Sequence, residues 1–329
     1  MKILFYSAKA YDRAFFDAAN TAKHHALQFI DVRLSLQTSE LARGYEGVCV
    51  FVNDLLNEEV LTALQGIGVR CILLRCAGYN HLDRAACQRL GLNVAYVPRY
   101  SPYSVAEHTV ALVLALNRKT HRAYARVREN NFSIDGLLGF DLHGRTVGLI
   151  GVGRIGAITG RIMAGFGCKI LAYDPAPAGD RPDCVALTSF EEVIANADIL
   201  SLHCPLNPST RHVLNEKTLR LCRPGVMVIN TSRGGLIDTA AMIDALKVGR
   251  VGYLGIDVYE EEADYFYEDL SEKILDDDNL SRLISFPNVL ITAHQAFFTR
   301  EALTTIAETT LDNARAFESG VEPINALRL

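Results

Sequence analysis

The chain has 329 residues, more than a single hydrophobic core usually supports, so about two domains are expected. Its content of 49% hydrophobic and 22% charged residues is typical of a well-buried globular protein. The formal net charge of -5 argues against binding to nucleic acid, which normally needs clustered Lys and Arg, and against binding to an anionic membrane surface.

No segment of the sequence is predicted to enter a membrane or to direct export. The apolar run at residues 3–6 is too short for a signal-peptide core, and the run at 110–116 cannot span about 30 Å of hydrocarbon. The eight cysteines form no C-x-x-C pair, which favours buried thiols over disulfides or zinc ligands. We therefore expect a soluble cytoplasmic protein without a metal site.

The first hundred residues alternate short apolar runs with helical patterns. Such alternation is typical of βαβ units and of a mostly parallel sheet. The expected strands span 3–6, 27–31, 48–52, 69–74 and 94–97, and the expected helices span 54–66 and 83–90.

A long helix is expected to begin near Ser104, because Ser104 and Glu107 have the spacing of a capping box. Arg118 and Lys119 suit its C-terminal end. The body of this helix, residues 105–116, is apolar on nearly all sides, which predicts burial between layers or between domains.

A second alternating series begins at residue 146 and contains about six expected strands, the size of a complete dinucleotide-binding domain. One of its helices is predicted to be capped by Ser189 together with Glu192, and a further helix at 299–318 follows the series. The six strands span 146–150, 169–173, 199–202, 226–230, 254–257 and 289–292.

The nucleotide-binding series starts in mid-chain and leaves a helix after it, which favours one domain inserted into another. Residues 1–100 and 298–329 would form one α/β domain, and residues 101–297 the other. Both are predicted to be doubly wound parallel sheets, with a ligand cleft between them.

A glycine-rich loop follows the first strand of the second series. Gly151, Gly153 and Gly156, with Arg154 and Ile155 between them, form the pattern G-x-G-x-x-G before a helix, which allows close approach of a pyrophosphate. Asp174 ends the next strand, where a carboxylate would accept hydrogen bonds from the adenosine ribose and repel a 2′-phosphate. The loop therefore predicts NAD rather than NADP, unless Asp174 merely turns the chain.

Three polar residues, Arg233, Glu262 and His294, lie at or just past the ends of later strands. Guanidinium is a natural partner of a carboxylate, and imidazole can exchange a proton near neutral pH. Together they suit reduction of a small acidic carbonyl compound. The alternatives are a surface arginine, a structural histidine and a solvated acidic run, since 260–262 are all glutamate and the pattern does not choose among them.

Five segments resemble the D-isomer-specific 2-hydroxyacid dehydrogenases in their order and spacing over essentially the whole chain. They are G-V-G-R-I-G at 151–156, H-C-P-L at 203–206, N-T-S-R-G at 230–234, D-V-Y-E at 257–260 and H-Q-A at 294–296. Further segments resemble the fermentative D-lactate dehydrogenase branch: R-C-A-G-Y-N at 75–80, V-P-R-Y-S-P at 97–102, F-F-T at 297–299 and the acidic-aromatic stretch 260–278.

The resemblance implies a Rossmann NAD-binding domain inserted into a flavodoxin-like substrate domain. It implies a catalytic triad of Arg233, Glu262 and His294, and so selects Glu262 from its neighbours. Substrate-binding residues would be Ala77 and Gly78, through their backbone, with Tyr100 and Phe297 as pocket walls unless these are ordinary loop and core aromatics. The remaining implied cofactor-binding residues are His203, Cys204, Pro205, Thr231, Ser232 and Asp257, the last also supporting the triad.

The activity implied by the resemblance is reversible NADH-dependent reduction of pyruvate to D-lactate by a homo-oligomer, either a dimer or a tetramer. One alternative is the same reaction on a bulkier 2-oxo acid, such as 2-oxoisocaproate or phenylpyruvate. A more distant alternative is an NAD-sensing regulator, although such proteins usually carry recognition segments beyond the catalytic core.

Overall fold

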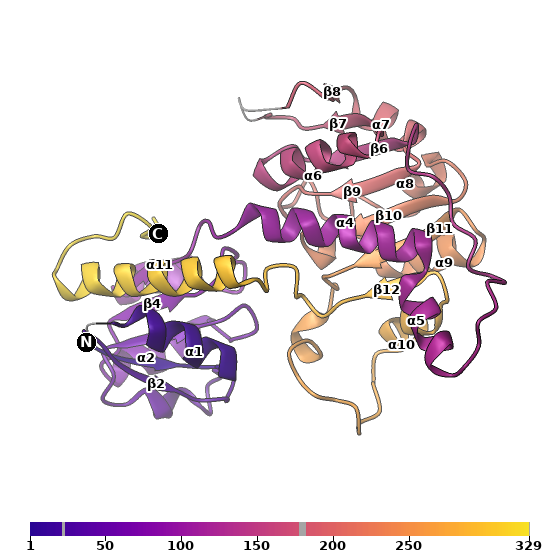
Figure 1. Ribbon diagram of the computed structural model, residues 1–329. Helices are drawn as coiled ribbons and strands as arrows, with labels where there is room; N and C mark the ends of the chain where they lie inside the picture. Colours follow the sequence, from indigo (N-terminus) through magenta and orange to yellow (C-terminus); the bar gives the residue numbers. More distant parts are fainter. Residues whose placement is uncertain (22–23, 178–181, 329) are drawn as a thin grey trace. The chain divides into compact units, whose positions relative to one another are not determined.

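The computed structural model describes residues 1–21, 24–177 and 182–328 of the chain. They fold into two compact units, one formed by Met1–Ser101 and Phe298–Leu329 and the other by Pro102–Phe297. The first unit is therefore discontinuous in sequence. Figure 1 shows both units coloured along the chain.

The N-terminal unit is built on a five-stranded sheet in which neighbouring strands pair in parallel. The strand order β2-β1-β3-β4-β5 is the flavodoxin-like arrangement, as predicted. Each of the five expected strands is present, although shorter than expected by one or more residues in most cases. Their bounds are β1 Lys2–Phe5, β2 Ala26–Phe29, β3 Gly47–Val50, β4 Cys71–Leu74 and β5 Asn93–Ala95.

Three helices of the N-terminal unit, α2, α3 and α11, begin at side-chain caps. Asn57 accepts a hydrogen bond from the Val60 amide at the start of α2, and Thr299 accepts one from the Ala302 amide at the start of α11. Helix α1 packs against α11, and α2 packs against α3. Their bounds are α1 Ala10–Ala19, α2 Glu58–Gly66, α3 Arg84–Leu90 and α11 Arg300–Glu318, with a 3-10 helix η1 at Ser39–Ala42.

The second unit is built on a seven-stranded parallel sheet with the order β12-β11-β10-β9-β6-β7-β8. From β8 to β11 this order reads 3-2-1-4-5-6, the arrangement of dinucleotide-binding domains. The expected two-domain α/β fold is therefore confirmed. The strands are β6 Thr146–Ile150, β7 Lys169–Tyr173, β8 Val185–Leu187, β9 Ile199–Leu202, β10 Val226–Asn230, β11 Val251–Ile256 and β12 Val289–Ile291.

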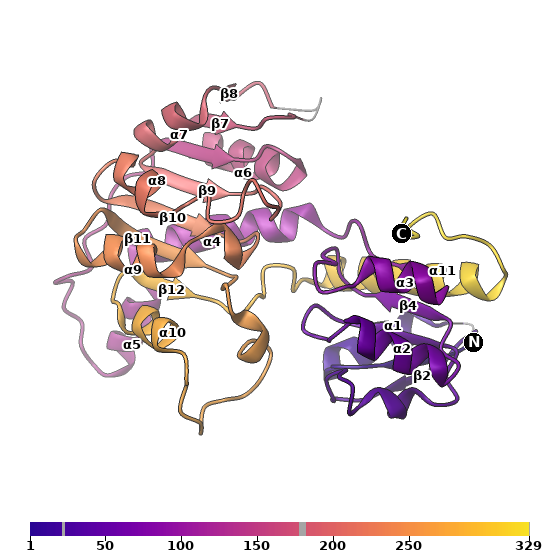
Figure 2. The same ribbon diagram turned by 180° about the vertical axis from the view of Figure 1, so that it is seen from behind.

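Two hydrophobic cores cover the faces of this sheet. One contains α4 and α6, whose side chains pack on Leu149, Ile199 and Ile229, and the other contains α7 to α10. Figure 1 shows α4 and α6 in front of the strands, and Figure 2 shows α7 to α10 on the opposite side. The helices are α4 Pro102–Arg118, α5 Thr120–Arg128, α6 Arg154–Gly165, α7 Phe190–Asn196, α8 Glu216–Leu221, α9 Thr239–Lys247 and α10 Asp278–Ser285.

The predicted capping box at Ser104 is wrong. Helix α4 begins at Pro102, so Ser104 lies buried in its first turn. Proline suits this first position, because its fixed φ matches the helix and its missing N–H has no helical partner there. The expected cap of α7 is confirmed, since the Ser189 hydroxyl accepts a hydrogen bond from the Glu192 amide at 3.2 Å.

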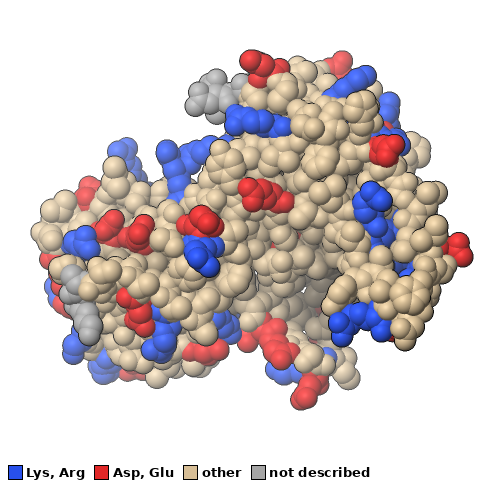
Figure 3. Space-filling model, in the orientation of Figure 1, with Lys and Arg blue, Asp and Glu red and all other residues tan. Residues whose placement is uncertain are grey.

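Seven of the eight cysteines are buried and all eight are free thiols, as predicted, with Cys184 the exposed one. Within the described ranges, no helix is both long and apolar enough to span a membrane. On the face drawn in Figure 3, acidic and basic side chains are interspersed.

Candidate active site

The carboxyl ends of six adjacent strands in the second unit carry the residues that the sequence singles out. Asp174 follows β7, the glycine loop follows β6, His203 follows β9 and Arg233 lies in the loop after β10. Asp257 follows β11, and the loop that holds His294 follows β12. Strand order reverses between β6 and β9, and ligands of open α/β sheets bind beside such a reversal.

The glycine loop has a shape that only glycine permits. Gly151 has a φ of +96°, and a Cβ there would lie 2.7 Å from the backbone nitrogen of Cys204. A Cβ on Gly156 would collide with the carbonyl oxygen of Gly151, whereas the space around Gly153 is open. Gly153 is the N-cap of helix α6 and has no side chain to cap it, so the first amides of α6 remain available to an anion. The loop therefore fits the pyrophosphate of a dinucleotide.

Asp174 is tied to the same loop. Its carboxylate accepts hydrogen bonds from the amide of Val152 at 2.7 Å and from the amide of Ala176 at 2.9 Å. Asp174 thus does hold the turn, and it also places a negative charge beside the glycine loop. Each carboxylate oxygen can accept a second hydrogen bond, so this role is compatible with binding a ribose.

The segment His203–Cys204–Pro205 packs against the glycine loop, close to Gly151 and Gly156. His203 bonds the Ser201 hydroxyl at 2.9 Å, and burial lowers the pKa of its imidazole to about 4. Burial raises the pKa of the Cys204 thiol to about 11, so this cysteine stays protonated and is not a nucleophile. The Ser232 hydroxyl donates to the Cys204 carbonyl at 2.8 Å, which links this segment to the loop after β10.

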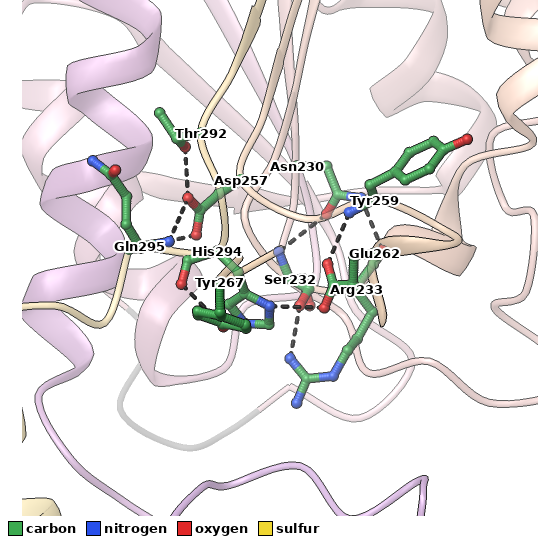
Figure 4. A network of polar contacts seen from close by, with 11 residues as sticks. Asn230, Ser232, Arg233, Asp257, Tyr259, Glu262, Tyr267, Thr292, His294 and Gln295 are labelled. Carbon is green, nitrogen blue, oxygen red and sulfur yellow. Dashed lines mark hydrogen bonds and ion pairs between the residues drawn. The ribbon is translucent and has the colours of Figure 1, made fainter. Parts of the chain in front are cut away.

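His294 and Glu262 form a direct pair, shown in Figure 4. The Nδ1 atom of His294 lies 2.8 Å from Oε1 of Glu262. The other carboxylate oxygen of Glu262 accepts a hydrogen bond from the Tyr259 amide at 2.9 Å, which fixes the carboxylate. Nε2 of His294 has no partner among the described residues, so it is the nitrogen presented to a ligand.

Asp257 holds the loop that carries His294. Asp257 is fully buried, and its carboxylate accepts hydrogen bonds from the Thr292 hydroxyl at 2.5 Å and from the amides of Gln295 and Ala296. Its carbonyl oxygen accepts from the His294 amide at 2.7 Å. These bonds stabilise His294 at a φ of +51°, which is uncommon for a residue other than glycine.

Glu260, Glu261 and Glu262 have different surroundings in the structure. Glu260 lies 2.6 Å from Nε2 of His212 and 3.1 Å from the guanidinium of Arg211. Glu261 is exposed. Of the three glutamates, Glu262 is the one that contacts His294, a distinction that depends on the turn Tyr259–Glu262 and is absent from the local sequence pattern.

Arg233 lies in a loop that packs tightly against the segment before Glu262. A Cβ on Gly234 would collide with the backbone of Tyr259, so only glycine lets these two loops approach. The guanidinium donates to the Ser232 carbonyl at 2.7 Å and has no acidic partner among the described residues. It is therefore available to bind a carboxylate.

Thr231 and Ser232 support this loop from inside. The hydroxyls of Thr231 and Thr109 lie 2.8 Å apart, and the Asn230 side chain bonds the Ser232 amide and the Arg233 carbonyl. Thr109 and Asn230 were not predicted as site residues, and their positions in a helix and at a strand end give no separate signal.

The expected substrate-binding residues divide between the units. Ala77 and Gly78 follow β4 in the N-terminal unit, and their amides donate to no other described group. Tyr100 lies half-buried in the same unit. Phe297 ends the second unit, with its ring centroid 6.5 Å from that of His294.

Comparison with known proteins identifies relatives of this chain. The family profile described as D-isomer specific 2-hydroxyacid dehydrogenase, NAD binding domain, matches residues 110–296. D-lactate dehydrogenase kk1H of Curvularia clavata is 49% identical over 99% of this chain and 95% of its own length.

Two solved structures share the fold over their full length. The apo-structure of D-lactate dehydrogenase from Escherichia coli superposes with a TM-score of 0.91 and 44% identity, covering 100% of both chains. The NAD complex of a D-isomer specific 2-hydroxyacid dehydrogenase from Lactobacillus delbrueckii ssp. bulgaricus has a TM-score of 0.80 and 31% identity, again covering 100% of both. The chain therefore belongs to the D-isomer specific 2-hydroxyacid dehydrogenase family, as its motifs predicted.

Proposed function

We propose that this protein is a D-lactate dehydrogenase that reversibly reduces pyruvate to D-lactate with NADH. The observation that carries the proposal is the 2.8 Å contact between Glu262 and His294, in the same site as an arginine without an acidic partner among the described residues. The D configuration is inferred from the family and from the D-lactate dehydrogenases similar to this chain.

Arg233 is the proposed ligand of the substrate carboxylate. Its planar guanidinium can donate two parallel hydrogen bonds to a carboxylate and can polarise the neighbouring ketone. The amides of Ala77 and Gly78 are proposed as further carboxylate donors, with Tyr100 and Phe297 bounding the methyl group.

His294 is the proposed acid. Because Nδ1 faces the Glu262 carboxylate, the imidazolium form is stabilised and Nε2 carries the proton that can be given to the ketone oxygen. Loss of that proton leaves neutral imidazole, still held in place by Glu262. In the reverse direction the neutral ring accepts the proton of the hydroxyl.

NAD is the proposed cofactor, bound by the glycine loop with His203, Cys204, Pro205, Thr231, Ser232 and Asp257. When bound, NADH supplies the hydride that reduces the carbonyl carbon. The negative charge of Asp174 beside the loop disfavours the 2′-phosphate of NADP. Residues 101–297 are the proposed NAD-binding domain, and residues 1–100 with 298–329 the proposed substrate-binding domain.

A homo-oligomer in the cytoplasm is also proposed. Helix α5 and the loop after it expose large apolar side chains, a feature that favours self-association. They are Tyr124, Val127, Phe132, Ile134 and Leu138. The seven buried free thiols suit a reducing compartment. Light scattering after gel filtration tests the assembly, and a monomeric mass would contradict it.

Turnover on a panel of 2-oxo acids tests the proposed activity. Pyruvate, 2-oxoisocaproate and phenylpyruvate are each offered with NADH and with NADPH, and the product is resolved by chirality. The expected result is the highest kcat/KM for pyruvate with NADH and D-lactate as the product. A preference for a bulkier acid, an L product or no turnover on any acid would contradict the proposal.

A further inference from the structure

Tyr267 contacts His294 from the segment between the 3-10 helix η3 (Glu262–Asp264) and α10. Its hydroxyl donates to the carbonyl oxygen of His294 at 3.3 Å. Its ring centroid lies 5.9 Å from that of the imidazole, with 34° between the planes. Tyr267 has a φ of +71°, a conformation that an aromatic residue rarely adopts. Such strain is kept only where surrounding contacts demand it.

We propose that Tyr267 is a positioning residue for the proton-donating imidazole, holding the His294 backbone through its hydroxyl and favouring the imidazolium form through its ring. The inference rests on the proposed function, because it assigns Tyr267 a part in the proton transfer by His294. Figure 4 shows Tyr267 beside His294, with the two rings tilted relative to each other.

The backbone of His294 is held at both of its polar groups. The amide donates to the Asp257 carbonyl at 2.7 Å, and the carbonyl accepts from Tyr267. Each of these bonds offsets part of the cost of keeping His294 at a φ of +51°. The Tyr267 hydroxyl therefore helps to keep the imidazole facing Glu262.

The ring of Tyr267 is placed to attract a positive charge on the His294 imidazole. A cation within about 6 Å of an aromatic face is attracted by the ring quadrupole. Among the described residues, the charged groups recorded at His294 or drawn beside it are Glu262 from η3, Asp257 after β11 and Arg233 from the loop after β10. His108 from α4 is a further titratable group, and it contacts Asp257. Glu262 and Asp257 favour the imidazolium and Arg233 opposes it, so the Tyr267 ring adds to the two carboxylates.

Two substitutions separate the effect of the Tyr267 hydroxyl on the His294 backbone from the effect of the Tyr267 ring on the imidazole charge. Tyr267→Phe removes the hydroxyl and keeps the ring, whereas Tyr267→Leu removes both. Tyr265 provides matched controls, because it lies two residues earlier, packs against the same hydrophobic core and has a hydroxyl that donates to no described group. The controls are Tyr265→Phe and Tyr265→Leu.

For Tyr267→Phe, kcat for pyruvate reduction is expected to fall by about two- to tenfold with KM nearly unchanged, as for loss of one hydrogen bond. For Tyr267→Leu, the alkaline limb of the kcat/KM profile is expected to move to lower pH, because the attraction between the aromatic ring and a positive charge on His294 is lost. Tyr267→Phe should leave that limb in place, and the Tyr265 variants should leave both kcat and the limb in place.

A second readout does not depend on turnover. The pH midpoint of the His294 ring resonance, followed by NMR in protein without cofactor, is expected to fall in Tyr267→Leu and to stay in Tyr267→Phe. Midpoints and limbs equal to those of wild type in Tyr267→Leu, or equal changes in Tyr265→Leu, would overturn the role of Tyr267. Absence of turnover by the wild-type protein would instead contradict the proposed function. The NMR titration would still test whether Tyr267 acts on His294.

Discussion

His294 is held by four groups of the second unit, three from residues 257–267 and one from its own loop. The Asp257 carbonyl binds its amide, Tyr267 binds its carbonyl, Glu262 binds Nδ1, and the Phe297 ring lies at its side. Such redundancy maintains a left-handed backbone conformation that costs about 1–3 kcal/mol in isolation. One ring nitrogen is thereby fixed on Glu262 and the other is left for substrate.

Replacing Arg233 with lysine tests the carboxylate-binding role. Lysine keeps the positive charge and loses the planar pair of donors, so kcat/KM for pyruvate should fall by about ten- to a hundredfold, the worth of one hydrogen bond between charged groups. Steady-state kinetics measure this effect. Arg220→Lys on the exposed face of α8 is the control and should leave kcat/KM unchanged. Equal kcat/KM values for Arg233→Lys and wild type would contradict the proposal that Arg233 binds the substrate carboxylate.

Replacing Glu262 with glutamine tests the source of the charge on His294. Because a carboxylate 2.8 Å from Nδ1 attracts the positive charge of the protonated ring, its loss should move the alkaline limb of pyruvate reduction to lower pH. Activity requires the protonated ring, so the variant should lose activity at a pH where wild type retains it. Glu261→Gln removes the same charge one residue away and should leave the profile in place. Identical profiles in the two variants would contradict the pairing.

The approach of two loops at Gly234 is the element on which the position of Arg233 depends. A Cβ on Gly234 would meet the backbone of Tyr259, which bonds Glu262. Gly234→Ala should therefore lower both kcat/KM and Tm, the latter by about 2–8 °C if the overpacking costs about 1–3 kcal/mol. Gly165→Ala, in open space at the end of α6, is the control. Unchanged Tm and kinetics in Gly234→Ala would show that the loops have room to move.

The end of β7, where Asp174 follows the strand, is the element that should select NAD. Asp174→Asn keeps an acceptor for the Val152 amide and removes the charge. The ratio of kcat/KM for NADPH to that for NADH should rise by about tenfold or more, since a like-charge contact costs several kcal/mol. Comparing the two cofactors at constant pyruvate measures this ratio. If the ratio does not rise, the charge of Asp174 does not select the cofactor, and its role is limited to the hydrogen bonds with the amides of Val152 and Ala176.

Element prediction from the sequence succeeded where burial and periodicity agree. Most strands of the two sheets are apolar runs of that kind, and the predicted cap at Ser189 is a local signal. Strand β8 was missed because it is three residues long and only Val185 is buried. The start of α4 was misplaced because Pro102 and Ser104 are both plausible first residues, and the packing of the first turn decides between them.

Across the whole molecule, the two parallel sheets could be predicted because the strands of each sheet follow one another along the chain as short apolar runs. The active-site contacts could not, since they join residues from loops that are far apart in the chain. Glu262 reaches His294 through a turn that also binds Tyr259, and Tyr267 reaches it through a strained backbone. Family resemblance selected Glu262 from the residues at 260–262, but gave no indication of Tyr267.

The central claim is that His294 supplies the proton in an NADH-dependent reduction of pyruvate. The most direct test is kcat for pyruvate reduction by His294→Gln compared with wild type, with folding of the variant checked by circular dichroism. A loss of about 10²–10⁴-fold is expected, the usual contribution of a positioned acid. A kcat within a few-fold of wild type in a folded variant would contradict the claim.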